Sequence, residues 1–234
     1  MKLASLERGR EGRLFVVSDD MGWQVSAAEV APTLGAAIAD WERCEPLLRG
    51  VAEFLNRGAQ RYVRFEPTAC QAFCRGQFEV EGAIVLARGA TAIVGALAKG
   101  SSREAAAAAV RLVQLHLVGP QGAAESPLAV SVDALGEAWK AGRLSCAPML
   151  EQDGVTAAAT PVVLDFAAAI AEAARSGDIA AGTRFSLTDP RPVRLAKLVD
   201  GEMVRYELRD ALSRSTFGAI ELRAKIAQAV KERA

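Results

Sequence analysis

The stretch Phe78-Glu79-Val80-Glu81 decides how the rest of the chain is interpreted, because it alternates apolar and acidic residues. Such alternation predicts a strand, here from Gln77 to Leu86, in which residues two apart point to the same face. Glu79 and Glu81 would then hold two carboxylates side by side, and Mg²⁺, Mn²⁺ and Ca²⁺ prefer oxygen ligands of this kind. The pair predicts a metal site, although a solvated strand face has the same pattern.

The composition is that of an ordinary globular protein with no dominant charge. The 234 residues are 51% hydrophobic, and 28 Lys plus Arg balance 28 Asp plus Glu. This balance argues against nucleic acid as a partner, because phosphate binding requires an excess of cations. A near-neutral surface also tolerates self-association. The sequence shows no secretory signal and no apolar run of about 18 residues, which predicts a cytoplasmic protein without a membrane partner.

The four cysteines lack the spacing of a disulfide framework, so reduced thiols are expected. Cys70 and Cys74 are close enough in sequence to suggest a metal or reactive site. No second Cys/His pair at zinc spacing accompanies them, so structural thiols are the favoured interpretation.

Upstream of the acidic stretch, the sequence predicts one strand followed by a long helix. Leu14–Val17 is a short apolar run typical of a strand. Ser26 and Glu29 have the spacing of a capping box, which predicts that a helix begins there. Pro46 is expected to break or kink this helix, and Gly58 to end it.

Downstream, Ser101–Leu117 has the strongest helical pattern, with Ser101 as the N-cap, Glu104 as its capping-box partner and an alanine-rich interior. Residues 90–98 fit either a strand or a buried helix, and periodicity does not choose between them. The Gly- and Pro-containing segment Gly119–Pro127 predicts a loop.

The remaining elements are predicted from short patterns. Leu128–Val132 suits a strand, after which Asp133 is expected to cap a short helix. Asp165–Arg175 predicts a helix ended by Gly177. Strands joined by turns are expected from 193 to 221, and a helix over Leu222–Val230.

This mixture of strands and segregated helices predicts an α+β fold rather than a regular βαβ alternation. The irregular composition of residues 59–76 is the best candidate for a domain boundary. The prediction is therefore a small N-terminal α/β domain at 1–66 and a larger, β-rich domain at 67–234.

Several segments, in their order along the chain, resemble bacterial fumarylacetoacetate hydrolase (FAH)-like proteins. They are Met1–Leu6, Phe78–Ala83, Ser126–Trp139, Asp165-Phe166, Ala180–Thr183 and Phe217–Glu221. The resemblance implies a mixed β-structure of the FAH type with a small N-terminal domain, usually assembled as a dimer. It implies cleavage, hydration, decarboxylation or tautomerisation of small oxo-acids. It also implies a divalent metal, Mg²⁺ or Mn²⁺ ahead of Ca²⁺, held by Glu79 and Glu81 plus a further Asp, and no organic cofactor.

The chain departs from this family pattern at several positions, which makes it a shortened member with an eroded catalytic site. Val118 stands where the resemblance places the third metal carboxylate, and Gln121–Glu125 replaces a longer loop that carries a Lys. Ser186 and Thr188 are candidates within Thr183–Asp189, which stands where the resemblance places a Gly-Ser-Gly-Thr type segment.

Three residues could substitute for the missing groups. His116 is the only histidine and could act as a base or ligand, although a packed histidine near a helix end is the simpler interpretation. Glu125 and Asp133 could add carboxylates to a rebuilt metal site.

These observations leave three hypotheses open. The first is a metal-dependent hydrolase or lyase of small oxo-acids. The second is a catalytically inactive relative that binds a small molecule, or pairs with a full-length family member in place of a homodimer. The third is a divergent enzyme whose shortened loops open a new pocket.

Overall fold

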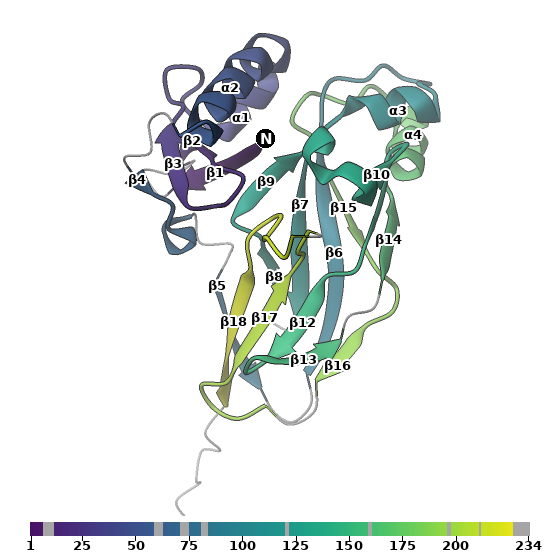
Figure 1. Cartoon of the computed structure of the whole chain (residues 1–234). Helices are drawn as coiled ribbons and strands as arrows, with labels where there is room; N and C mark the ends of the chain where they lie inside the picture. The colour runs from purple at the N-terminus through teal and green to yellow at the C-terminus, as the bar shows by residue number, and fades with distance from the viewer. Residues whose placement is uncertain are drawn as a thin grey trace, which may run out of the picture.

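The computed structural model describes residues 1–6, 12–58, 63–70, 75–80, 84–119, 122–158, 161–195, 198–210 and 212–226, and shows an α+β architecture (Figure 1). The predicted fold class is confirmed. Among these residues, no helix combines the length and the apolar character needed to cross a membrane.

The N-terminal part consists of antiparallel strands covered by two helices (Figure 1). The strands are β1 (Lys2–Leu6), β2 (Arg13–Val17), β3 (Trp23–Ser26) and β4 (Val63–Arg64). The helices are α1 (Leu34–Ala39) and α2 (Trp41–Asn56). The buried stripe of α2 recurs at helical spacing, which is why this helix packs against the sheet. Its members are Trp41, Cys44, Leu48, Ala52 and Leu55.

The main sheet is antiparallel and runs without a break from the middle of the chain into the N-terminal strands. Its order is β15 (Arg184–Thr188), β6 (Ile84–Val94), β7 (Val110–Gly119), β9 (Leu128–Ser131), then β1 to β4. β8 (Gly122–Glu125) pairs with β7, and β16 (Val193–Leu195) pairs with β6. Because Lys2 of β1 pairs with Val130 of β9, one sheet joins both parts. The domain division at 66/67 stays a prediction.

Two smaller sheets and the remaining helices complete the described structure. The first sheet contains β13 (Val155–Ala158), β12 (Met149–Gln152), β17 (Met203–Glu207), β18 (Ile220–Ile226) and β5 (Arg75–Val80). The second contains β10 (Trp139–Lys140), β11 (Arg143–Cys146) and β14 (Val162–Asp165). The other helices are α3 (Arg103–Ala109), α4 (Phe166–Ser176) and the 3₁₀ helices η1 (Pro67–Ala69) and η3 (Val132–Ala138).

β6 and β7 carry apolar residues on both faces, because each face packs against a different core over part of its length. Ala90 and Leu115 belong to the larger core, which lies among the two smaller sheets and α4. Ile93 and Leu112 belong to the core that α1 and α2 cover. Strands buried on both faces read as nearly continuous apolar runs, so their period is hard to recognise in the sequence.

The predicted helix over Ser101–Leu117 is wrong in its second half. α3 ends at Ala109 and has Ser102, not Ser101, as its N-cap, since the Ala105 amide donates to Ser102 Oγ at 3.2 Å. The chain then continues as β7 and pairs with β6 and β9. The alanine run ends at Ala109, and the β-branched residues that follow, such as Val110 and Val113, favour this extended pairing.

The predicted helix start at Ser26 is also wrong. Ser26 is the last residue of β3, opposite Phe15, and the first helix begins after Thr33, whose Oγ1 accepts a hydrogen bond from the Ala36 amide at 3.1 Å. Pro32 explains the delay, because a proline disfavours helical geometry in the preceding residue.

The break in the N-terminal helical region lies at Asp40, between α1 and α2, and α2 continues through Pro46, where a break or kink was predicted. The predicted end at Gly58 holds within two residues, since α2 ends at Asn56 and the Gly58 amide donates to the Leu55 carbonyl at 3.1 Å.

Three further predictions need correction. The predicted loop Gly119–Pro127 contains β8, and the predicted helix from Leu222 is strand β18 up to Ile226, while residues 227–230 lie outside the described residues. Asp133 makes no cap, because Ser131 occupies the N-cap position of η3 without a side-chain hydrogen bond.

Other predictions are confirmed. The Leu14–Val17 strand is part of β2, and Leu128–Val132 contains β9. The Asp165 side chain caps α4 by accepting from the Ala168 amide at 3.0 Å, and Gly177 ends that helix.

Candidate functional site

A row of polar residues crosses four neighbouring strands on one face of the main sheet. Thr188 of β15 lies opposite Gly89 of β6, which in turn lies opposite His116 of β7. His116 lies opposite Glu125 of β8. Because residues opposite one another in a sheet share a face, these side chains lie on the same side.

A second row lies next to the first on the same face. Ser186 of β15 is opposite Thr91 of β6, and Thr91 is opposite Gln114 of β7. The sheet therefore brings together His116, Glu125, Ser186 and Thr188, four of the residues singled out in the sequence.

His116 is buried, and both of its ring nitrogens have hydrogen-bond partners. Only 4% of the residue is exposed. Nδ1 lies 3.1 Å from Thr91 Oγ1, which lies 2.9 Å from Ser186 Oγ, and Nε2 lies 3.4 Å from Thr188 Oγ1. We call Thr91, His116, Ser186 and Thr188 the histidine cluster. Burial lowers the pKa of His116, opposed by the Glu125 carboxylate, so the neutral imidazole is favoured at pH 7.

The His116 ring occupies the space left by a missing side chain. A Cβ added to Gly89 would lie 2.2 Å from His116 Nε2 and 2.3 Å from the Leu187 carbonyl oxygen. The imidazole thus packs over Gly89 and leans toward β15. This geometry favours the interpretation of His116 as a packed residue.

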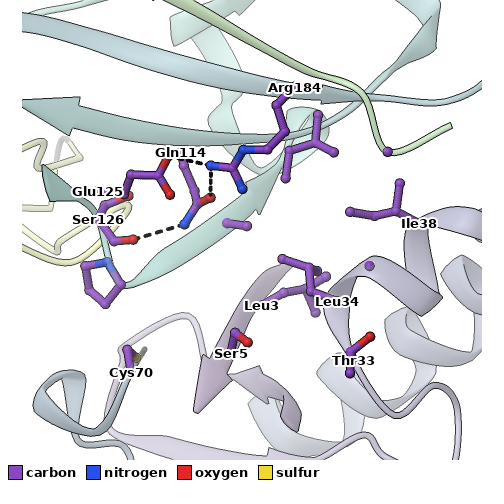
Figure 2. Close-up of a pocket in the computed structure, with 15 residues that line it drawn as sticks. Leu3, Ser5, Thr33, Leu34, Ile38, Cys70, Gln114, Glu125, Ser126 and Arg184 are labelled. Carbon is purple, nitrogen blue, oxygen red and sulfur yellow. Dashed lines mark hydrogen bonds and ion pairs between the residues drawn. The ribbon is translucent and has the colours of Figure 1, made fainter. Parts of the chain in front are cut away.

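A cavity of about 640 Å³ lies beside the histidine cluster, between the N-terminal part and the main sheet (Figure 2). It is lined by Leu3, Ser5, Thr33, Leu34, Gly35, Ile38, Cys70, Ile93, Gln114, Glu125, Ser126, Pro127, Ala129, Gly182 and Arg184. This volume is within the range of roughly 300–1,000 Å³ that is usual for small-molecule sites.

One side of the cavity is polar, and we call its three residues, Gln114, Glu125 and Arg184, the polar wall (Figure 2). Arg184 forms an ion pair with Glu125 and donates to Gln114 Oε1 at 3.5 Å. Gln114 Nε2 donates to the Ser126 carbonyl oxygen at 3.1 Å. These bonds hold an amide and a guanidinium at the cavity surface.

Sequence reasoning missed Gln114 and Arg184. Gln114 is two residues from His116, so the two share a strand face. The signal was hidden because the segment was interpreted as a helix, in which residues two apart diverge.

Comparison with known proteins identifies the fold. Residues 1–73 match the family model of the fumarylacetoacetase N-terminal domain 2. A protein described as HpcE from Mycobacterium smegmatis superposes with a TM-score of 0.66 at 14% identity, over 97% of this chain and 100% of that one. The chain has the fumarylacetoacetate hydrolase fold. The resemblance inferred from the sequence is confirmed.

Two further structures with this fumarylacetoacetate hydrolase fold cover the chain equally well. Maleylpyruvate hydrolase from a Sphingobium species has a TM-score of 0.65 at 15% identity, over 97% of this chain and 100% of that one, and was also crystallised with manganese(II) and pyruvate. A probable 2-hydroxyhepta-2,4-diene-1,7-dioate isomerase from Mycobacterium abscessus has a TM-score of 0.65 at 10% identity, over 98% of this chain and 100% of that one. A search of curated protein sequences found no match.

The Glu-x-Glu segment of this fumarylacetoacetate hydrolase fold is only partly described. Glu79 is in β5, at the register position opposite Lys225 of β18, and Glu81 lies outside the described residues. β5 contacts β8, the strand that ends at Glu125. The metal role of Glu79 and Glu81 stays a prediction.

The described residues contain no group of three His, Cys, Asp or Glu that could hold a metal ion. Val118, at the position that the resemblance assigns to a carboxylate, is half-buried on β7 opposite Ala87 and Ala123.

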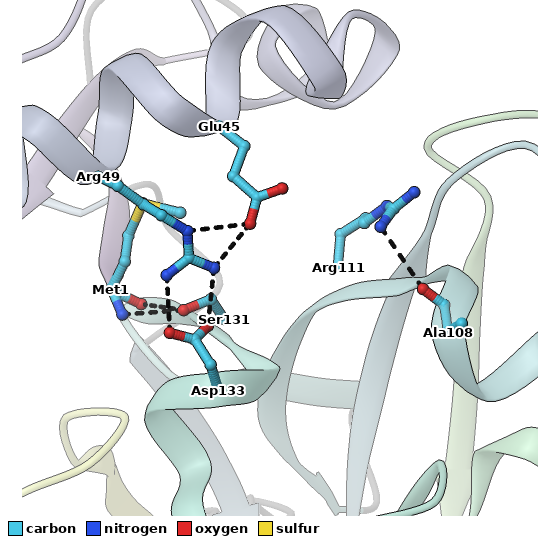
Figure 3. Close-up of polar contacts among 7 residues, drawn as sticks. All are labelled: Met1, Glu45, Arg49, Ala108, Arg111, Ser131 and Asp133. Atoms are coloured by element: carbon cyan, nitrogen blue, oxygen red, sulfur yellow. Dashed lines mark hydrogen bonds and ion pairs between the residues drawn. The ribbon is translucent and has the colours of Figure 1, made fainter.

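Asp133 lies in a different cluster from Glu125. Its carboxylate accepts two hydrogen bonds from Arg49 of α2, at 2.7 and 3.0 Å (Figure 3). Arg49 holds the pKa of Asp133 well below its usual range. The Met1 ammonium donates to Ser131 Oγ at 2.8 Å beside this pair. This cluster ties α2 to η3 and β1 to β9.

The cysteines within the described residues are not joined in disulfides. Cys44 and Cys70 are buried, Cys146 is half-buried, and Cys74 lies outside the described residues. Burial raises the pKa of Cys146 to about 12, so its reactive thiolate form is suppressed at neutral pH.

Proposed function

We propose that this protein acts on small oxo-acids as a divalent-metal-dependent hydrolase or lyase, with the metal at Glu79 and Glu81. One observation carries the proposal: in a chain with this fold, a cavity with a polar wall is lined by a residue of β8, which contacts β5, the strand that contains Glu79. Glu125 of the wall is the last residue of β8, and β8 contacts β5.

The donor chemistry supports a hard divalent cation, preferably Mg²⁺ or Mn²⁺, although the donor number is small. Two carboxylates that are two residues apart in the sequence are suitable ligands, and the described residues supply no cluster of three. A metal bound there would polarise the oxo-acid and stabilise negative charge developing on its oxygen. The proposal includes no organic cofactor.

The residues of the polar wall would orient the substrate. Arg184 is half-exposed, and its guanidinium has donors beyond those used for Glu125 and Gln114. A substrate carbonyl oxygen can accept from this fork, and the rigid sheet beneath keeps the donor in place. The histidine cluster lies beside this surface on the same sheet face, and its two buried members, Thr91 and His116, are already hydrogen-bonded.

A second candidate is a catalytically inactive relative that binds a small oxo-acid or pairs with a full-length family member. Two observations favour it. Val118 is apolar at the expected third ligand position, and His116 has partners on both nitrogens. Either candidate could form a homodimer, which light scattering would reveal. Both are proposed to be cytoplasmic, and reduced cysteines, as found among the described residues, are usual in that compartment.

The discriminating experiment is calorimetric titration with Mn²⁺, followed by a coupled assay for pyruvate release from an acylpyruvate. We expect Mn²⁺ to bind the wild-type protein and not Glu79→Ala or Glu81→Ala. Glu172→Ala, which removes an exposed carboxylate from α4, is the matched control and should bind as the wild type does.

The outcomes separate the candidates. Metal binding with pyruvate release supports the enzyme, and metal binding without turnover supports the inactive relative. No heat at millimolar Mn²⁺ contradicts a metal site at Glu79 and Glu81.

A further inference from the structure

We infer that the cavity takes an uncharged, mostly apolar tail of the substrate, so that the preferred oxo-acid ends in an alkyl or aryl group and not in a second carboxylate. This inference rests on the proposed function, because it assumes that the oxo-acid group binds near β5.

Apart from the polar wall, the lining is mostly apolar, although it includes the hydroxyl groups of Ser5 and Thr33. It combines aliphatic side chains from the sheet with others from α1 (Figure 2). These residues are Leu3, Leu34, Ile38, Ile93 and Ala129. A hydrocarbon tail placed against them would be removed from water, which stabilises binding by about 0.8 kcal/mol for each buried CH₂.

The charges of the lining cancel. Among the described residues that line the cavity, Arg184 is the one cation and Glu125 the one anion, and they form an ion pair with each other. A second substrate carboxylate would lie close to Glu125 and would have to compete with it for Arg184. Because a buried charge without a partner is costly, the cavity disfavours a dicarboxylate.

The N-terminal part of the chain supplies much of this specificity. Leu34 and Ile38 lie one helical turn apart on α1, whose start is held by the Thr33 cap. Helix α1 is thus a specificity element for the tail, separate from the strand expected to hold the metal.

The test compares three probes by calorimetry in the presence of Mn²⁺. Pyruvate represents the oxo-acid group alone, 2,4-dioxodecanoate adds an alkyl tail, and the matching 2,4-dioxodecanedioate ends that tail in a carboxylate. We expect 2,4-dioxodecanoate to bind at least about tenfold more tightly than the dicarboxylate, because only the latter must place a charge in the cavity.

Two variants locate the effect. Leu34→Trp should fill the cavity and abolish the preference for the alkyl tail while leaving pyruvate affinity unchanged. Leu47→Trp, at an exposed position of α2, is the matched control. Glu125→Gln should free Arg184 and raise the affinity for the dicarboxylate, an effect that loss of structure would not produce.

The results also separate this inference from the proposed function. If pyruvate binds but the dicarboxylate binds as tightly as 2,4-dioxodecanoate, or if the preference survives Leu34→Trp, the inference is wrong. If pyruvate does not bind in a Mn²⁺-dependent manner, the proposed function is wrong and the inference falls with it.

Discussion

Two groups of polar residues lie side by side on one face of the main sheet. They differ in the burial of their central side chains and in how many of the polar atoms are already hydrogen-bonded. The histidine cluster is centred on His116, which is 4% exposed and bonded through both ring nitrogens. The polar wall contains Arg184, whose side chain is 45% exposed at the rim of a cavity. Residue type alone would rank the histidine first for function, whereas burial and hydrogen bonding favour the arginine.

The largest loss of stability should come from filling the space between Gly89 and the His116 ring. Gly89→Ala would place a Cβ 2.2 Å from His116 Nε2 and 2.3 Å from a backbone oxygen, so strand and ring must both move. We expect a loss of about 3 kcal/mol in the free energy of unfolding, at the upper end of overpacking effects, measured by urea denaturation.

Gly50→Ala is the control for this substitution, because its Cβ would meet nothing within 4 Å and the residue lies inside α2. It should stabilise the protein by about 0.5–1 kcal/mol. Equal effects of the two substitutions would show that His116 does not depend on the space over Gly89.

A smaller effect is expected from His116→Gln, which should cost about 1–2 kcal/mol at pH 7.5 through lost hydrogen bonds and altered packing. Since burial lowers the pKa of His116, the unfolded chain binds its proton more readily than the folded one. Wild-type stability should therefore fall as the pH drops below about 6.5, the ordinary histidine pKa.

The measurement is the free energy of unfolding between pH 7.5 and 5 for both proteins. The variant should lose less stability over this range, because the titrating imidazole is gone. A parallel loss in both proteins would mean that His116 is not the group responsible.

The smallest effect on stability is expected at the polar wall. Arg184→Met breaks a partly exposed ion pair and should change the unfolding free energy by less than about 1 kcal/mol. The same variant should weaken binding of 2,4-dioxodecanoate about tenfold, because the carbonyl loses its donor. A loss of more than about 2 kcal/mol in the free energy of unfolding would show that Arg184 has a structural role. It would contradict the proposed difference between Arg184 and His116.

Sequence reasoning succeeded where local chemistry is decisive. The helix that begins after Asp165 was found because an N-cap side chain and a terminating Gly177 act within a few residues. It failed at Val110–Gly119, which follows a genuine helical alanine run. That segment is a strand because partners from elsewhere in the chain pair with both of its edges.

The sequence identified several residues of the candidate site, but it did not show how they are arranged in space. His116, Glu125, Ser186 and Thr188 were each named, and pairing across four strands brings them together. Gln114 and Arg184 were missed because they come together only in the folded sheet, where both belong to the polar wall of the cavity. The metal role of Glu79 and Glu81 stays a prediction.

By itself, the sequence determined the family resemblance, the α+β class and the local helix signals, because these depend on residue identity and short-range spacing. The tertiary structure alone decided that β7 is a strand, that His116 packs over Gly89, and that Arg184 faces a cavity shared with α1. These properties depend on pairing and burial between segments far apart in the chain, and such contacts have no local signature.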